Sequence, residues 1–323
     1  MIPHNWITEA GDRLRGRIKR TPVTFDKALD CYLKWENQQE TGSFKLRGAL
    51  NKVLTLQPWE RELGLVTSSA GNHGQGVAVA ARLMGVKVTI FASEHAVPAK
   101  IKSMLAMGAD VRLVPGGYAQ AEAAGIQFAA QQEQIWISPY NDGQVIAGQA
   151  TVGLELLDEV PVDELEAVVV PVGGGGLIAG IGLVLDQLPP ENRPSLIGVQ
   201  STASPYFHAL IHQGSQDGVV ESASLADGLA GRIEDGSITI PLVRKLVDDV
   251  ILVSEDEIEQ AVAAAWYRYG ATIEGSGAVV LAAALTGKFS QRPAALIISG
   301  GNIQPETHQQ LLQRWSPKER SNQ

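Results

Sequence analysis

Short apolar runs alternate with amphipathic stretches along almost the whole chain. Residues 86–92 and 167–172 form runs typical of buried strands, whereas residues 98–107 and 118–132 carry their apolar side chains at helical spacing. Repeated alternation of strand and helix predicts an α/β fold with mostly parallel sheets, because parallel strands need helical crossovers. Ligand sites of such folds lie at the carboxyl ends of strands, so we expect the chemistry in the loops that follow them.

The same patterns place the other elements and one connection. Ser254 is a predicted N-cap, and residues 138–143, rich in turn formers, are predicted to connect two domains. The polar tail 316–323 is predicted to fray. Further strands are predicted over residues 31–35, 64–68, 111–114, 135–137, 196–200, 250–253 and 295–298. Further helices are predicted over residues 6–19, 46–54, 77–84, 146–157, 177–188, 204–212, 255–269 and 275–285.

Composition and charge narrow the functional classes. The 323 residues are 45% hydrophobic and 19% charged, as in soluble globular proteins, and the net charge of −9 disfavours a nucleic-acid-binding surface. No apolar run is long enough to span a membrane, and the first residues lack a signal-peptide pattern. The single cysteine, Cys31, suits a reducing compartment, so we expect a cytoplasmic protein. His208 and His212 are four residues apart but have no evident third ligand, so we expect no metal site.

A lysine at a helix start is the first candidate for chemistry. Ser43 is a predicted N-cap, which puts Lys45 in the first turn of the following helix. A cation there opposes the helix dipole, at a cost of about 0.3–1 kcal/mol when solvated. Lys45 is therefore either an ordinary surface lysine or a desolvated amine of lowered pKa, which can form a Schiff base with a carbonyl cofactor.

Four consecutive glycines follow the apolar run 167–172. They are Gly173, Gly174, Gly175 and Gly176. Their amides lie at a helix start, where N–H groups and the helix dipole favour a phosphate. The spacing matches neither the dinucleotide pattern Gly-x-Gly-x-x-Gly nor a Walker motif, which favours an isolated phosphate group. Tight packing of the helix on the strand is the structural alternative.

Two other loops follow predicted strands. The first contains Ser69, Ala70, Gly71, Asn72 and His73. Its amides and hydroxyl suit a carboxylate, and the Asn72 amide could instead contact a ring hydroxyl. Ser299 ends the last strand and could hold a ring nitrogen without fully protonating it. Ordinary capping and a closing turn are the structural alternatives, and Asp227 and Glu274 lie in less informative loops.

Together, a Schiff-base lysine, a phosphate cradle, a carboxylate cradle and a ring-nitrogen partner describe pyridoxal phosphate (PLP) bound to an amino acid. Five motifs resemble those of the fold-type II PLP enzymes, specifically the threonine/serine dehydratase and serine racemase group. They are GSFKLRGA (42–49), SAGNH (69–73), VIAGQ (145–149), PVGGGGL (171–177) and SGGN (299–302). The resemblance implies a tryptophan synthase β-like α/β fold of two three-layer domains, with residues 1–64 and 142–323 in the large domain and 65–141 in the small one.

The resemblance also implies roles for single residues. Lys45 would carry the cofactor, and Phe44 would lie against its ring. Asn72 would contact the ring hydroxyl and Ser299 the pyridine nitrogen. The phosphate would be bound by Gly173, Gly174, Gly175, Gly176 and Leu177. The substrate carboxylate would be received by Ser69, Ala70, Gly71, Asn72 and His73. The protein would be a homodimer or homotetramer.

The residue before Gly71 bears on the reaction. Serine racemases that resemble this chain have a serine there, whereas Ala70 has no proton to deliver to Cα. The resemblance therefore favours dehydration and deamination of L-threonine and L-serine to 2-oxo acids and ammonia. Gln200 and Tyr206 stand where the racemases have acidic metal ligands, which argues against a divalent cation. Racemisation, or elimination from another 3-hydroxy amino acid such as hydroxyaspartate or phenylserine, is the alternative. We expect no C-terminal regulatory domain, since no residues are left to build one.

Overall fold

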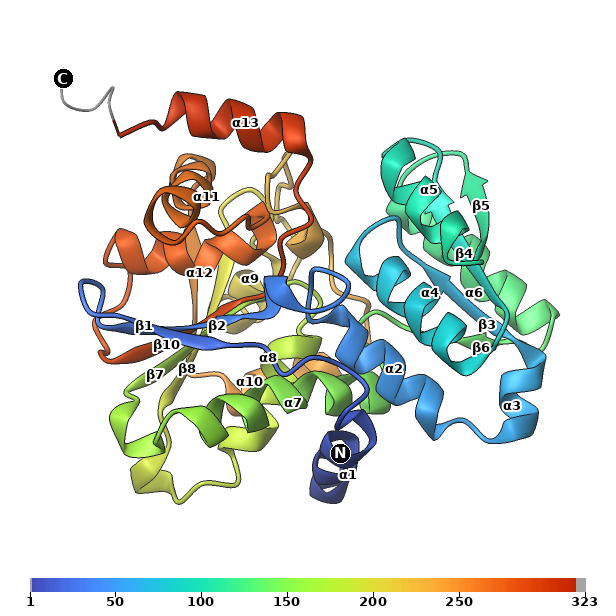
Figure 1. Ribbon diagram of the computed structural model, residues 1–323, viewed down its shortest axis with the longest axis horizontal. Coiled ribbons are helices and arrows are strands. Elements are labelled where there is room, and N and C mark those ends of the chain that lie inside the picture. Colours follow the sequence, from blue (N-terminus) through green and yellow to red (C-terminus); the bar gives the residue numbers. More distant parts are fainter. Residues whose placement is uncertain (1, 318–323) are drawn as a thin grey trace.

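Two sheets, each covered by helices, make up residues 2–317, the part of the chain described by the computed structural model (Figure 1). The strands of the larger sheet are β1 (Val23–Asp26), β2 (Cys31–Trp35), β7 (Ala167–Pro171), β8 (Ser195–Ser201), β9 (Asp249–Val253) and β10 (Ala294–Ile298). Their order is β1-β2-β10-β7-β8-β9. Only the pairing of β1 with β2 is antiparallel. The predicted α/β fold with mostly parallel sheets is confirmed.

The smaller sheet belongs to a separate lobe, on the right of Figure 1. Its strands are β3 (Leu65–Ser68), β4 (Val88–Ser93), β5 (Asp110–Val114) and β6 (Ile135–Trp136), in the order β5-β4-β3-β6. Its helices are α4 (Asn72–Met84), α5 (Pro98–Ala106) and α6 (Tyr118–Gln131). We call residues 65–136 the small lobe and the part around the six-stranded sheet the large lobe.

Two helices lead from the large lobe to the small one. They are α2 (Lys45–Thr55) and α3 (Pro58–Leu63). Leu46 and Leu50 of α2 share one apolar cluster with Leu65 and Val77 of the small lobe. The core of the small lobe therefore continues into α2, so the helix that begins at Lys45 is fixed to both lobes.

Helices cover both faces of the six-stranded sheet. The longer ones are α1 (His4–Leu14), α7 (Gly143–Glu159), α8 (Gly176–Leu185), α9 (Tyr206–His212), α10 (Thr239–Leu246), α11 (Glu255–Tyr269), α12 (Gly275–Leu285) and α13 (Pro305–Arg314). Single 3-10 turns are η1 (Glu36–Gln38), η2 (Val162–Glu164), η3 (Pro190–Asn192) and η4 (Asp227–Leu229). In β7, Val168 and Val170 pack into the cluster with α7 and α8, and Val169 into the cluster with α12. Burial on both faces explains why this strand is apolar throughout.

The predicted helices 255–269 and 275–285 match α11 and α12, and Ser254 caps α11 as predicted. Four elements, β1, α3, α10 and α13, have no predicted counterpart. β1 is a four-residue edge strand with two exposed residues, so its sequence carries little strand pattern. The first helix ends at Leu14 instead of residue 19, because the chain turns at Gly16 with φ of 72°. Of the predicted frayed tail, residues 318–323 lie outside the described residues.

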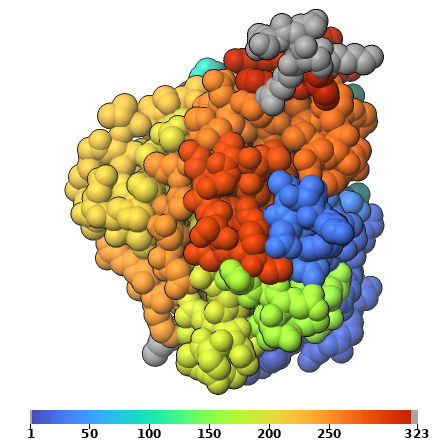
Figure 2. Space-filling model, turned by 90° about the vertical axis from the view of Figure 1, so that its left-hand side faces the viewer, coloured from blue at the N-terminus to red at the C-terminus, as the bar shows by residue number. Residues whose placement is uncertain are grey.

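The two ends of the large sheet have different surroundings. Figure 2 shows the face at the amino ends of its strands, where the blue turn between β1 and β2 adjoins the orange-red segment before β10 and the green segment before β7. The carboxyl ends point the other way, toward the small lobe (Figure 1). Within the described residues no helix is long and apolar enough to cross a membrane.

Candidate active site

Lys45 is the first residue of α2 and lies where the two lobes meet. Its Nζ donates a hydrogen bond to the Pro139 carbonyl at 3.1 Å, and it lies 5.2 Å from the centroid of the Phe44 ring. Burial lowers the pKa of Lys45 from 10.5 to about 8, although the nearby Glu274 carboxylate acts in the opposite direction. A substantial fraction of this amine is therefore neutral near physiological pH. This agrees with a desolvated amine and not with an ordinary surface lysine, the two interpretations that the sequence left open.

This lowered pKa makes a prediction for the protein without cofactor. The rate at which acetic anhydride acetylates Lys45 should rise with pH around a midpoint near 8, because only the neutral amine reacts. Peptide mass spectrometry after brief labelling at each pH measures this rate separately for every lysine. A midpoint above about 10, the range of an ordinary lysine, would contradict the burial argument.

Ser43 does not cap α2, so that prediction is wrong. Phe44 occupies the N-cap position, and Ser43 instead forms a backbone bridge with Gly300. This bridge holds Ser43 beside the chain that follows β10, and its Oγ is buried without a hydrogen-bond partner among the described residues. The Phe44 N–H also donates to the Ser299 carbonyl at 3.1 Å. The segment before Lys45 is therefore joined directly to the loop after β10.

The four glycines form the turn between β7 and α8, as predicted. Gly175 is the N-cap of α8 with φ of 85°, a conformation that favours glycine. The first amides of a helix have no intrahelical acceptor, and no hydrogen bond among the described residues uses the N–H groups of Gly173, Gly174 or Gly175. These free donors and the positive end of the helix dipole form a site suited to a phosphate.

Packing also restricts these glycines. A Cβ on Gly174 would lie 2.2 Å from the Tyr140 ring, and one on Gly173 would lie 3.0 Å from Leu229 Cα. Tyr140 follows Pro139, whose carbonyl accepts the Lys45 hydrogen bond, so one short segment links the lysine to the glycine turn. Tight packing of α8 on β7 explains why these positions are glycines. The unpaired amides of the same turn favour an anionic ligand.

Gly174→Ala is expected to weaken PLP binding by at least about tenfold, because overpacking costs about 1–3 kcal/mol and the turn must shift away from Tyr140. Titration of the apoprotein with PLP measures this affinity. Gly117→Ala is the control, since its backbone φ is −92° and the nearest atom is 3.5 Å away. The double variant Gly174→Ala/Tyr140→Ala, which lacks the obstructing ring, should regain part of the affinity for PLP. Equal affinities of wild type and Gly174→Ala would contradict phosphate binding by the glycine turn.

Asn72 is held by two residues of the large lobe. Its Nδ2 donates to Glu274 Oε1 at 2.6 Å, and its Oδ1 accepts from Asn302 Nδ2 at 2.7 Å. Burial, reinforced by the charge of Asp227, raises the pKa of Glu274 to about 7. Glu274 also accepts from the Asn302 N–H at 3.2 Å, which closes a ring of hydrogen bonds across the lobes. The sequence placed Glu274 in a less informative loop and gave Asn302 no role of its own; the glycines next to both residues are the only signal in the sequence.

The loop that contains Asn72 ends β3 and begins α4. Ser69 Oγ accepts from the Gly71 N–H at 3.1 Å, which closes a tight turn around Ala70. His73 is buried, and its Nε2 is 3.1 Å from the Ile137 carbonyl, to which it donates. Burial and the charge of Lys45 lower the pKa of His73 to about 3, so this imidazole is neutral at physiological pH. The free amides at the start of α4 suit a carboxylate.

Ser299 lies at the end of β10, beside the Phe44 backbone. Its Oγ makes only a long hydrogen bond of 3.5 Å, to the Ser276 carbonyl. A bond of this length is weak, so the hydroxyl is available for a ring nitrogen. The structure thus gathers the predicted lysine, asparagine loop, glycine turn and serine at the carboxyl ends of β3, β7 and β10.

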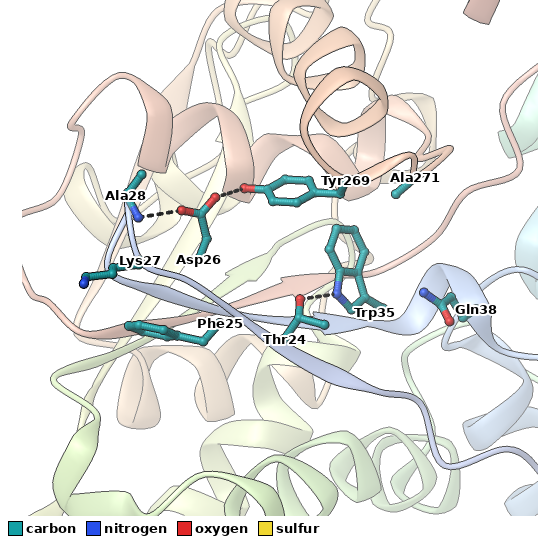
Figure 3. A pocket seen from close by; sticks show the side chains of 9 residues that line it. All are labelled: Thr24, Phe25, Asp26, Lys27, Ala28, Trp35, Gln38, Tyr269 and Ala271. Atoms are coloured by element: carbon teal, nitrogen blue, oxygen red, sulfur yellow. Dashed lines mark hydrogen bonds between the residues drawn. The ribbon is translucent and has the colours of Figure 1, made fainter.

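A cavity of the described residues lies away from these loops. It has a volume of 570 Å³ and is lined by residues of β1, β2 and the end of α11, among them Phe25, Trp35 and Tyr269 (Figure 3). Two hydrogen bonds join polar residues of its lining: Asp26 accepts from the Tyr269 hydroxyl at 2.5 Å, and Trp35 Nε1 donates to Thr24 at 2.7 Å. No predicted site residue lines this cavity.

The histidine pair does not extend the site. The rings of His208 and His212 lie 4.3 Å apart, and both approach the Val250 carbonyl. Gln200 donates to the Val172 carbonyl at 3.1 Å and accepts from the His208 N–H at 2.8 Å, so its amide joins α9 to the end of β7. Within residues 2–317 no three His, Cys, Asp or Glu side chains are grouped to hold a metal ion.

These residues fit PLP. The unpaired amides before α8 match its phosphate, the Lys45 amine matches its carbonyl, and the weakly bonded Ser299 hydroxyl matches its ring nitrogen. Each group also lies on a different element that is held in place by the bonds described above.

Comparisons with known proteins agree with this fit. Residues 14–300 match the family described as "Pyridoxal-phosphate dependent enzyme". The chain is 40% identical over 323 residues to an L-threonine ammonia-lyase of Geobacter sulfurreducens, covering 97% of this chain and 79% of that protein. It is 38% identical to the catabolic L-threonine dehydratase of Escherichia coli, covering 92% of each. Among solved structures, serine racemase of Dictyostelium discoideum aligns with a TM-score of 0.84 and 34% identity, covering 94% of this chain and 99% of that one. The chain therefore belongs to the fold-type II family of pyridoxal-phosphate-dependent enzymes.

Proposed function

We propose that this enzyme is a PLP-dependent L-threonine/L-serine ammonia-lyase. It would convert L-threonine to 2-oxobutyrate and ammonia, and L-serine to pyruvate and ammonia. The observation that carries the proposal is the Lys45 amine: its pKa is about 8, whereas His73 beside it is neutral and Ala70 has no proton to give. The names of the relatives in Geobacter and Escherichia support the same substrate.

We infer a task for each residue of the site. The amides of Gly173, Gly174, Gly175, Gly176 and Leu177 would bind the cofactor phosphate. Phe44 would lie against the ring, and Ser299 would accept or donate at its nitrogen. Asn72, oriented by Glu274 and Asn302, would contact the ring hydroxyl. The loop of Ser69, Ala70, Gly71, Asn72 and His73 would bind the substrate carboxylate.

Elimination needs the Cα proton and the β-hydroxyl to leave. When bound, PLP supplies an electron sink that makes the Cα proton acidic. Lys45 takes this proton, and a pKa near 8 suits a general base at physiological pH. The neutral His73 adds no second base or acid, and its bond to the Ile137 carbonyl fixes the start of α4. A single base on one face favours elimination over racemisation.

The organisation of the protein is part of the proposal. Residues 65–141 would form a small domain, and residues 1–64 and 142–323 the large PLP-binding domain, which the two separate sheets support. The free, buried thiol of Cys31 is consistent with the cytoplasm. We also propose that the protein assembles into a homodimer or homotetramer, as the resemblance to the family implies.

A panel of 3-hydroxy amino acids tests the function. Purified holoenzyme is given L-threonine, L-serine, 3-hydroxyaspartate or phenylserine, and the 2-oxo acid and ammonia are measured. We expect the largest kcat/KM with L-threonine, with one ammonia per 2-oxo acid. No 2-oxo acid from L-threonine or L-serine would refute the proposal, and a preference for hydroxyaspartate or phenylserine would redirect it to another ammonia-lyase.

Serine racemisation is the second candidate, because a serine racemase shares the fold at 34% identity. It requires a proton donor on the face of Cα opposite Lys45. Ala70 provides none, and the buried His73 is neutral with its Nε2 engaged. D-serine formed from L-serine faster than pyruvate would favour this candidate.

A further inference from the structure

A lysine of the small lobe forms an ion pair with the large lobe. Lys100 is on α5, and its side chain is only 20% exposed. Its ammonium makes no hydrogen bond with the described residues, and its ion-pair partner among them is Asp227 of the large lobe, with Nζ 4.0 Å from Oδ2. The charge of Lys100 opposes the burial that raises the pKa of Glu274, so its electrostatic effect reaches the ring of hydrogen bonds around Asn72. A mostly buried cation beside a carboxylate of the other lobe indicates attraction between the lobes.

Asp227 begins the turn η4, which lies against the candidate phosphate cradle. The Gly228 carbonyl would be 3.2 Å from a Cβ on Gly173, so the two backbones touch. On its other side, the Gly228 N–H donates to Ser276 Oγ at 3.0 Å. The turn is therefore fixed to the large lobe, and Asp227, whose side chain is 72% exposed, presents its carboxylate to the cleft.

Lys100 is coupled to the carboxylate-binding loop through its own lobe. Met104, one turn further along α5, is buried against α4: its Sδ would be 2.8 Å from a Cβ on Gly74. Gly74 follows His73 and lies in the first turn of α4. A shift of α5 must therefore move the start of α4 and, with it, the loop from Ser69 to His73.

We propose that Lys100 and Asp227 are positioning residues, whose ion pair draws the small lobe onto the large one and holds the carboxylate-binding loop over the substrate. Neither side chain touches the reacting atoms. The pair stabilises the closed arrangement, so it raises the affinity for substrate and leaves proton transfer at Cα unchanged. For the substrate, this inference rests on the proposed ammonia-lyase function.

Kinetics of three variants test the pair. Lys100→Met and Asp227→Asn should each raise KM for L-threonine about two- to fivefold, the effect of losing an ion pair with one exposed partner, and leave kcat unchanged, because closure contributes to binding and not to chemistry. The double variant should be no worse than either single one, since the two changes remove the same interaction. Lys102→Met, on the exposed face of the same helix, and Asp256→Asn, whose side chain is 68% exposed on α11, are the controls and should leave KM unchanged. A fall in kcat at constant KM, or an additive double variant, would overturn the proposal.

Ionic strength gives a second readout that a merely structural role would not change. Raising salt from about 0.01 M to about 1 M shortens the Debye length from about 30 Å to about 3 Å, so the wild-type KM should rise. The KM of Lys100→Met should respond much less to salt, and an equal response would contradict an ion pair.

Hydrogen exchange tests the contact without any substrate. In holoenzyme of Lys100→Met or Asp227→Asn, amides of α5 and of the turn 227–229 should exchange faster than in wild type, whereas amides of α13 should not change. Unchanged exchange at both places would overturn the proposal. If wild-type enzyme releases no 2-oxo acid from any 3-hydroxy amino acid, the proposed function fails, and the exchange experiment still decides whether the pair joins the lobes.

Discussion

Lys45→Ala is expected to lower release of 2-oxobutyrate from L-threonine by at least about 10⁴-fold, the upper range for loss of a general base. Under the proposed function, the variant loses both the amine that would take the Cα proton and the amine that would hold the cofactor carbonyl. It should still bind PLP without covalent linkage, because the amides before α8 are untouched. Single-turnover and steady-state assays at saturating PLP measure the loss.

The variant should fold normally, since alanine favours the helix start at least as well as lysine. Lys87→Ala is the matched control, because Lys87 is an exposed residue before β4 and should leave activity unchanged. After borohydride reduction of wild-type enzyme, mass spectrometry should find the cofactor mass on the Lys45 peptide alone. Activity of Lys45→Ala above about 1% of wild type would exclude Lys45 as the base.

Arg47→Met is expected to destabilise the protein by about 3–5 kcal/mol, the range measured when one partner of a buried ion pair is removed. Arg47 is fully buried two residues after Lys45. Its Nε is 2.7 Å from Glu36 Oε2 and its Nη1 is 2.7 Å from Glu155 Oε1, while Lys34 Nζ is 2.8 Å from the same Glu155 carboxylate. Without Arg47, the Glu36 carboxylate loses its ion-pair partner among the described residues, and η1 and α7 lose the side chain that joins both of them to α2.

Urea denaturation of wild type and variant measures the difference in free energy of unfolding. Arg15→Met is the control, since Arg15 is 80% exposed in an ion pair with Asp12 and should cost less than about 0.5 kcal/mol. Arg47→Met should also lose activity in proportion to its unfolded fraction, because Arg47 holds α2 and therefore Lys45 in place. A loss below about 1 kcal/mol would show that the buried network contributes little.

Sequence patterns predicted the fold and the site loops because both depend on local signals. The apolar run before the glycines, the cap Ser254 and the periodicity of α12 each lie within a few residues, so they can be read without the structure. Ser43 shows the limit of such reading. A serine before a helix usually caps it. The conformation of Ser43 is determined instead by its bridge to Gly300, which lies near the other end of the chain.

Long-range polar contacts could not be predicted. Lys34 reads as a surface residue in a strand, yet it is fully buried because Glu155, on a helix far along the chain, supplies its charge partner. Glu274 and Asn302 likewise orient Asn72 only because the two lobes meet there. A single sequence specifies the chemical types of these side chains, whereas their pairing depends on the tertiary structure.

The most direct test of a single base at Cα compares elimination with inversion at that carbon. L-Threonine is incubated with holoenzyme, and 2-oxobutyrate and D-allothreonine, the Cα epimer, are quantified together over time. With Lys45 as the only proton carrier beside Ala70, we expect 2-oxobutyrate and ammonia in equal amounts and no D-allothreonine. Formation of D-allothreonine at a rate comparable to 2-oxobutyrate would show a second acid at Cα and contradict the account.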